Sequence, residues 1–116
     1  MSALGEHLRH LREELKRENK KFSLRQLAEK AGITPGYLSQ VENGQVVPSD
    51  EKLQILGLEL NEDPDVLMLL AGRLSPELRA VTEKRPKLFS ELIRQLKNAP
   101  DHAILRVVRE VRDGDW

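Results

Sequence analysis

The chain has 116 residues, of which 39% are hydrophobic and 33% charged, and its acidic and basic side chains are equal in number. This size and balance predict one small globular domain, or one domain with an appendage. The absence of cysteine excludes a disulfide framework, a cysteine-based zinc site and a thiol nucleophile. No apolar run has the length of a membrane span, and the N-terminus lacks the apolar core of a signal peptide. We therefore expect a cytoplasmic protein.

The first predicted helix covers Ala3 to Glu18, because leucines recur along it at helical spacing: Leu4, Leu8, Leu11 and Leu15. A polar connection follows, and we expect Phe22 to anchor this connection to the core. His7 and His10 lie one helical turn apart and could share a metal ion. No third ligand of the right type is near them in the sequence, so we interpret them as part of an exposed helix face.

Two short helices are predicted between Leu24 and Gly44, and they are separated by Gly32. Their inward residues have the three-and-four spacing of amphipathic helices: Leu27, Ala28 and Ala31 in the first, Leu38 and Val41 in the second. Glycine ends a helix in the left-handed conformation at least cost. Ser23 and Thr34 are the expected N-caps, and Pro35 suits the first position of the second helix. The pattern predicts a helix-turn-helix.

The rest of the chain also has the pattern of helices, so an all-α fold is expected. Ser49 caps a fourth helix, in which Gly57 weakens the interior and the inward residues are Leu53, Leu56 and Leu60. Asp63 and Pro64 begin a fifth helix, which ends at Gly72 and carries Val66, Leu67, Leu69 and Leu70. Three further helices are predicted to begin near Ser75-Pro76, Pro86 and Pro100.

The segments S-L-R-Q-L-A-E-K-A-G and T-P-G-Y-L-S-Q-V-E-N-G together resemble the DNA-binding domain of the phage-repressor and xenobiotic-response-element regulators, the Cro/C1 type. The resemblance covers Ala3 to Gly72, about sixty per cent of the chain. It implies a five-helix, lambda-repressor-like domain over residues 1–72. The remaining residues, 73–116, contain no motif of comparable specificity and are expected to form a C-terminal helical extension.

A recognition helix inserts its N-terminal residues into the major groove of DNA. Because Leu38 and Val41 face inward, Gln40 should point outward, where its amide can pair with N7 and N6 of adenine. The resemblance also gives this position a base-reading role. Gly36 could permit close approach of the backbone. Two interpretations of Tyr37 stay open: contact with a phosphate or thymine methyl, or packing over the neighbouring helix end.

Phosphate contacts are expected at the first turn of the preceding helix, whose amide groups suit an anion. Many members of the family have glutamine where this chain has Leu24, so Arg25 and Gln26 are the expected substitutes. On the opposite strand we expect Asn43 and Gln45. The complete predicted set for double-stranded DNA is Ser23, Arg25, Gln26, Thr34, Pro35, Gly36, Tyr37, Ser39, Gln40, Asn43 and Gln45.

Glu42 is acidic and faces away from the expected DNA surface. The resemblance implies that it pairs with an arginine of the first helix, in a structural ion pair. Arg12 fits by its helix face and Arg17 by its distance from Ser23. We favour Arg12 as the partner.

The last two helices carry a broad apolar stripe, which we interpret as a dimer interface; its residues are Leu88, Phe89, Leu92, Ile93, Leu96, Ile104, Leu105, Val108 and Val111. The favoured function is a repressor that binds a pseudo-palindromic operator as a homodimer, with residues 34–43 in the major groove. The alternative is an antitoxin-type interaction protein that binds a partner polypeptide and regulates its own operon. A third interpretation has these helices simply covering the N-terminal core.

An enzyme is not expected. The sequence has no glycine-rich phosphate loop and no cluster of metal ligands, and its three histidines lack an arranged carboxylate partner. We therefore predict no cofactor and no bound metal.

Overall fold

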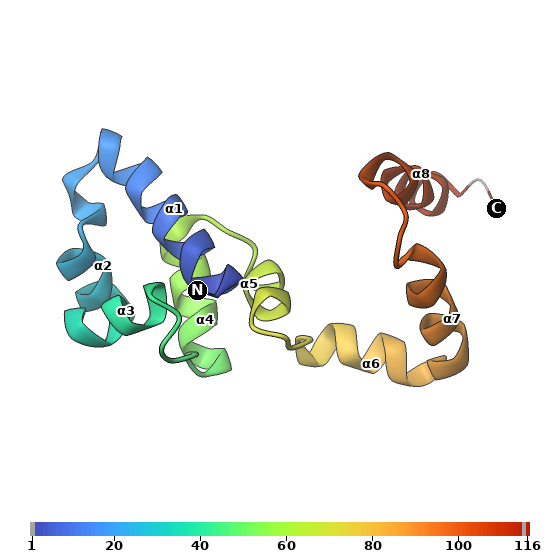
Figure 1. Cartoon of the computed structure of the whole chain (residues 1–116), viewed down its shortest axis with the longest axis horizontal. Coiled ribbons are helices and arrows are strands. Elements are labelled where there is room, and N and C mark those ends of the chain that lie inside the picture. Colours follow the sequence, from blue (N-terminus) through green and yellow to red (C-terminus); the bar gives the residue numbers. More distant parts are fainter. Residues whose placement is uncertain (1, 115) are drawn as a thin grey trace. The chain divides into compact units, whose positions relative to one another are not determined.

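The computed structural model describes residues 2–114 and 116, which form eight α-helices and one 3-10 turn (Figure 1). The helices are α1 (Ala3–Glu18), η1 (Lys20–Phe22), α2 (Leu24–Ala31), α3 (Pro35–Glu42), α4 (Asp50–Leu60), α5 (Pro64–Leu70), α6 (Pro76–Lys84), α7 (Pro86–Leu96) and α8 (Asp101–Arg112). The predicted all-α fold is confirmed. The chain divides into two compact units, one ending at Pro76 and the other beginning at Glu77.

The N-caps of the first unit explain where its helices begin. The Ser23 hydroxyl accepts a hydrogen bond from the Gln26 amide at 3.2 Å, and the Thr34 hydroxyl accepts one from the Tyr37 amide at 3.0 Å. These bonds satisfy amide groups that have no partner within the helix. Between α2 and α3, Gly32 has a φ of 70°, the left-handed conformation that glycine adopts without strain. The caps and the turn predicted from the sequence are confirmed.

The core of the first unit is enclosed by α1 to α5. Its buried apolar residues are Leu4, Leu8, Leu27, Ala28, Ala31, Leu38, Val41, Leu53, Leu56, Leu60, Leu67 and Met68. On α5, Val66 and Leu69 are 37% and 55% exposed. Five apolar residues follow one another in α5, so periodicity cannot select a face. Packing against α4 buries the edge that carries Leu67 and Met68 instead.

Gly57, which the sequence suggests only as a weak point of its helix, allows close packing at the turn into α5. It is buried, and a Cβ atom there would lie 2.9 Å from the Glu62 carbonyl oxygen and 3.2 Å from Pro64 Cγ. Any larger residue would therefore push the turn away from α4. The cost of glycine in the helix interior is offset by this close approach.

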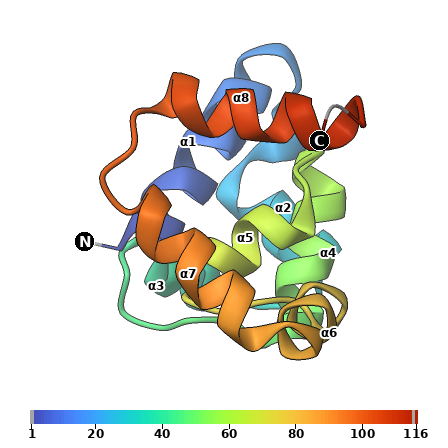
Figure 2. The same cartoon turned by 90° about the vertical axis from the view of Figure 1, so that its right-hand side faces the viewer.

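The second unit consists of α6, α7 and α8, three separate helices joined by short links (Figures 1 and 2). None of its described residues is buried within a helix. The three helices do not pack extensively against one another. In the described part of the chain, no helix is both long enough and apolar enough to cross a membrane.

Candidate nucleic-acid interface

The recognition helix α3 has one buried face and one exposed face. Leu38 and Val41 are fully buried against α1 and α2, whereas Pro35, Gly36 and Gln40 are exposed. Nothing lies within 4 Å of the position that a Cβ of Gly36 would occupy. No side chain on this exposed face is charged. The face therefore suits hydrogen bonding and close approach to base edges, with phosphate charge met elsewhere.

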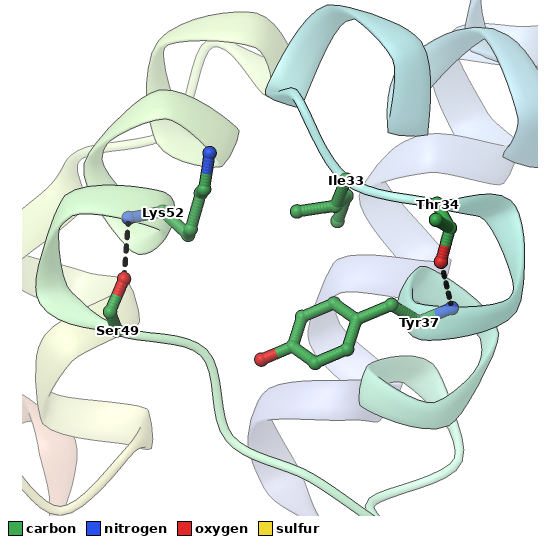
Figure 3. A pocket seen from close by; sticks show the side chains of 5 residues that line it. All are labelled: Ile33, Thr34, Tyr37, Ser49 and Lys52. Carbon is green, nitrogen blue, oxygen red and sulfur yellow. Dashed lines mark hydrogen bonds between the residues drawn. The ribbon is translucent and has the colours of Figure 1, made fainter.

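Tyr37 lies at the edge of this face and lines an open pocket between α3 and α4 (Figure 3). The pocket measures roughly 330 Å³ and is lined by Ile33, Thr34, Tyr37, Ser49 and Lys52. The tyrosine is half-buried, with its ring packed against the core and its hydroxyl in the pocket. Both interpretations of Tyr37 are therefore compatible with the structure. Its ring packs against the core, and its hydroxyl is free to donate a hydrogen bond to a phosphate.

The first turn of α2 presents the predicted phosphate-binding side chains. Arg25 and Gln26 are exposed, and Ser23 is half-buried because its hydroxyl caps the helix. The Arg25 Nε lies 3.6 Å from a carboxylate oxygen of Glu29, one turn further along the helix. The positive charge offered to a phosphate here is therefore partly balanced within α2.

The C-terminal end of α3 is fixed to α1 by a buried ion pair. Arg12 donates from Nε to Glu42 Oε2 at 2.7 Å and from Nη2 to Glu42 Oε1 at 2.9 Å. The side chains are 9% and 2% exposed. The hydrogen bond to Glu42 raises the pKa of Arg12 above its ordinary value. Arg17 instead contacts Glu14 on the surface, so of the two candidates the structure places Arg12 against Glu42.

Arg9 belongs to the same cluster and was not found by sequence reasoning. Its Nη2 donates to Asn43 Oδ1 at 2.6 Å, and its Nε lies 3.4 Å from Glu42 Oε1. The spacing of Arg9 and Arg12 by three residues, which puts them on one helix face, was the available signal. Because its Oδ1 accepts from Arg9, Asn43 can offer only its Nδ2 amide to the phosphate contact predicted for it.

The loop after α3 is held by contacts that the sequence did not suggest. Gln45 is exposed, and its backbone N–H donates to the backbone carbonyl oxygen of Gln40 at 2.8 Å. Arg73 donates to the Pro48 carbonyl oxygen at 2.9 Å, and Lys52 Nζ donates to the carbonyl oxygens of Ala31 and Gly32. Lys52 thus fixes the end of α2 to α4, and Arg73, which follows α5, fixes the loop. The remaining predicted contact, Ser39, is half-buried on α3.

His7 has a carboxylate partner, which corrects the expectation that no histidine is so arranged. Its Nε2 lies 2.8 Å from Glu62 Oε2, and the Asp63 amide donates to Glu62 Oε1 at 2.9 Å. The hydrogen bond to His7 lowers the pKa of Glu62, and the Asp63 amide adds to the effect. Sequence spacing could not find this pair, because 55 residues separate its members. Within the described residues, no three potential ligands gather in a group that could hold a metal.

The predicted interface residues of the second unit lie on α7 and α8. Six of them are strongly exposed, between 41% and 68%: Leu88, Leu92, Ile93, Leu105, Val108 and Val111. The other three, Phe89, Leu96 and Ile104, are half-buried. The two helices therefore present apolar surface that no other described helix of the second unit covers extensively.

Comparison with known proteins places the helix-turn-helix in a family. Residues 11–67 match the family model described as helix-turn-helix. The chain is also similar to the uncharacterized HTH-type transcriptional regulators Rv0474 and MT0491, from the H37Rv and CDC 1551 strains of Mycobacterium tuberculosis. Each is 43% identical over 60 residues, which cover 52% of this chain and 43% of the relative. No solved structure matches the chain. Residues 11–67 are therefore similar to the helix-turn-helix of regulators, in agreement with the Cro/C1 type predicted from the sequence.

Proposed function

We propose that the protein is a sequence-specific DNA-binding transcriptional repressor that acts as a homodimer on a pseudo-palindromic operator. The observation that carries this proposal is the exposed, uncharged face of α3 within a Cro/C1-type domain. The chain covers less than half the length of the curated relatives it matches, so the proposal concerns what these residues can do. The family is generally non-enzymatic, and no catalytic role is assigned.

Gln40 is the proposed base reader on that face. Its exposed amide can form two hydrogen bonds to adenine, whereas its backbone carbonyl only holds the following loop. The polar groups around it, Arg25, Gln26 and the Nδ2 amide of Asn43, are proposed to bind phosphates and to set the orientation of α3. In this proposal the phosphate contacts lie beside the recognition helix, and the contacts to DNA bases are made by the helix itself.

Titration of Gln40→Ala against operator and random DNA tests this role. The operator is first selected from a random pool with the full chain. Loss of a bidentate contact should weaken operator binding by about 1–3 kcal/mol and leave binding to random DNA nearly unchanged. Gln95→Ala, on exposed α7, is the matched control and should change neither. Equal losses on both DNAs would show that Gln40 does not read a base.

The homodimer is proposed because the second unit, over its described residues, lacks a buried core that would stabilise it on its own. A unit of about 40 residues usually needs disulfides, a metal or association to fold. The chain has no cysteine, and its described residues hold no group of metal ligands. The core of the first unit, for its part, is already packed by residues before Gly72 and leaves its leucines 0–2% exposed. Association with a second copy then accounts for the open faces of α7 and α8.

Two copies would also place two recognition helices on one face of DNA, about 34–36 Å apart, as two half-sites of a palindrome require. Sedimentation of the full chain at micromolar concentration tests the homodimer directly. A reporter controlled by the selected operator then separates repression from activation. A monomer at every accessible concentration would contradict the dimer, and increased transcription would contradict repression.

An antitoxin-type function is the second candidate, and the exposed apolar surface of α7 and α8 favours it equally. An amphipathic helix pair can cover a groove on another polypeptide as well as a second copy. Purification of the endogenous protein discriminates between them. A stoichiometric second polypeptide supports the antitoxin, whereas self-association alone supports the repressor.

A further inference from the structure

The last helix, α8, carries an apolar stripe that is left open along its whole length. Leu105, Val108 and Val111 are 49%, 52% and 61% exposed, and they recur at spacings of three residues. Ile104 and Val107 flank the stripe and are half-buried. A helix with this pattern normally packs its stripe against another element. Within the described residues of the second unit, no helix packs extensively on α8.

The stripe has opposite charges at its two ends. Asp101 is the first residue of α8 and Arg112 is the last, and both are exposed. Arg112 donates from Nε to the exposed Asp113 Oδ1 at 3.1 Å, so its other guanidinium nitrogens are the ones considered for a partner on a second copy. Eleven residues, or about three helical turns, separate them, so they lie on one face. The spacings from Asp101 through Leu105 and Val108 to Arg112 are four, three and four residues, which keeps all four side chains in one row.

This row is complementary to itself when it is reversed. In an antiparallel pair, residues at equal distances from the midpoint meet, and the midpoint of the row lies between Arg106 and Val107. Leu105 of one copy then faces Val108 of the other, and Asp101 of each copy faces Arg112 of the other. A parallel pair would instead bring two aspartates together at one end and two arginines at the other.

We propose that α8 pairs antiparallel with α8 of a second copy, about a two-fold axis next to Arg106 and Val107. This inference rests on the proposed homodimer and specifies its interface. Such an interface is isologous, because each contact occurs twice. The opposite charges at the ends select the antiparallel direction, and the apolar row between them excludes water. Arg106 and Glu110 pair with each other within the helix at 3.1 Å, outside the row.

Charge reversal tests the direction of pairing. Sedimentation measures the dissociation constant of the full-length dimer for Asp101→Arg, Arg112→Asp and the double variant. Each single reversal replaces two attractions by two repulsions and should raise the dissociation constant about tenfold. The double variant restores opposite charges and should return to within about threefold of the original. Glu110→Arg changes the net charge as Asp101→Arg does and is the matched control, for which little change is expected.

Restoration in the double variant cannot come from a more stable helix. An acidic first turn and a basic last turn stabilise a helix through its dipole, and the double variant reverses both. A dimer that tolerates all the reversals, or a double variant as weak as the singles, would overturn the antiparallel pairing. The homodimer would then have to form through another interface. If the original chain is monomeric throughout, the homodimer itself fails.

Disulfide cross-linking gives a second measurement, because the chain contains no cysteine of its own. A Leu105→Cys, Val108→Cys double variant should form a dimer on mild oxidation, since the two positions face each other between copies. Glu110→Cys lies outside the row and is the control. Cross-linking of the control as fast as the double variant would contradict the proposed axis.

Discussion

The two units of the chain use similar amphipathic helices with opposite results. In the first unit the inward leucines of α1, α2 and α4 are at most 2% exposed: Leu4, Leu8, Leu27, Leu53, Leu56 and Leu60. In the second unit Leu88, Leu92 and Leu105 of α7 and α8 are between 41% and 68% exposed. The polar contacts differ in the same way. Arg12 with Glu42 and His7 with Glu62 connect distant parts of the sequence, whereas the ion pairs seen in α7 and α8 join neighbours along one helix. An apolar stripe on a helix therefore predicts that this face will be buried, but it does not predict which element will cover it.

This difference separates folding from association. Removing apolar surface from water contributes about 25 cal/mol per Å², and the first unit obtains this within one chain. In the proposed homodimer the second unit obtains it by association, so its stability should depend on protein concentration. Substitutions in the first unit should change the free energy of unfolding, and substitutions in the second should change the dissociation constant.

The largest expected effect in the first unit is that of Glu42→Ala. The variant leaves the buried guanidinium of Arg12 without its partner, and breaking such a pair costs on the order of 3–5 kcal/mol. Urea unfolding of the full chain measures this loss. Arg17→Ala is the control, because Arg17 lies on α1 like Arg12 but its side chain is 76% exposed. This variant should change the free energy of unfolding by less than about 0.5 kcal/mol. If the two variants unfold alike, the pair does not stabilise the first unit.

Gly5→Ala should come next, because α1 crosses the end of α3 at this glycine. A Cβ atom there would lie 2.5 Å from the backbone carbonyl oxygen of Glu42, which cannot move without shifting α3. Overpacking of this kind costs about 1–3 kcal/mol, measured by thermal unfolding. Gly36→Ala is the matched control, since its Cβ would meet open space. The control should keep or slightly raise stability, and a loss equal to that of Gly5→Ala would contradict the steric explanation.

Sequence reasoning succeeded where the signal is local and failed where it depends on distant contacts. The caps at Ser23 and Thr34 and the turn at Gly32 are properties of a few neighbouring residues, and all are present in the structure. The buried face of α5 could not be predicted because its apolar residues are consecutive, and only packing against α4 decides between them. The contact of Arg9 with Asn43 spans 34 residues, so the helical spacing that puts Arg9 on the face of Arg12 does not identify Asn43 as its partner.

The candidate site divides in the same way. Periodicity was enough to separate the buried residues of α3 from Gln40 and the other exposed ones. The supports behind that face, Lys52 and Arg73, come from elements that meet α2 and the loop only after folding. Which DNA groups the predicted residues contact stays a prediction, because it depends on a partner as well as on the fold.

A substitution in the second unit should leave the free energy of unfolding of the first unit unchanged. Leu92→Ala removes apolar surface from the exposed stripe of α7, and we expect the dissociation constant of the dimer to rise about tenfold, or about 1.4 kcal/mol. Sedimentation measures the association. A chain ending at Pro76 provides the reference melting curve for the first unit and keeps the Arg73 contact with Pro48. A shifted melting curve for the first unit in Leu92→Ala would contradict its independence.

The smallest expected effect is the pH dependence of the contact between His7 and Glu62. Because the pKa of Glu62 is lowered on folding, its contribution is fully present above the pKa of the unfolded chain, about 4.3. That contribution decreases as the pH falls through the lowered pKa of the folded state, where the carboxylate is protonated. A double-mutant cycle of His7→Ala and Glu62→Gln isolates the coupling between the two side chains, for which we expect about 0.2–1 kcal/mol at pH 6 and less at pH 3. In the ion pair of Arg12 with Glu42, the arginine does not lose its charge over this pH range, because the raised pKa of Arg12 keeps the guanidinium protonated. A coupling that is the same at both pH values would show that the hydrogen bond does not favour ionised Glu62, and that the link from α1 to the α4–α5 turn is held by packing alone.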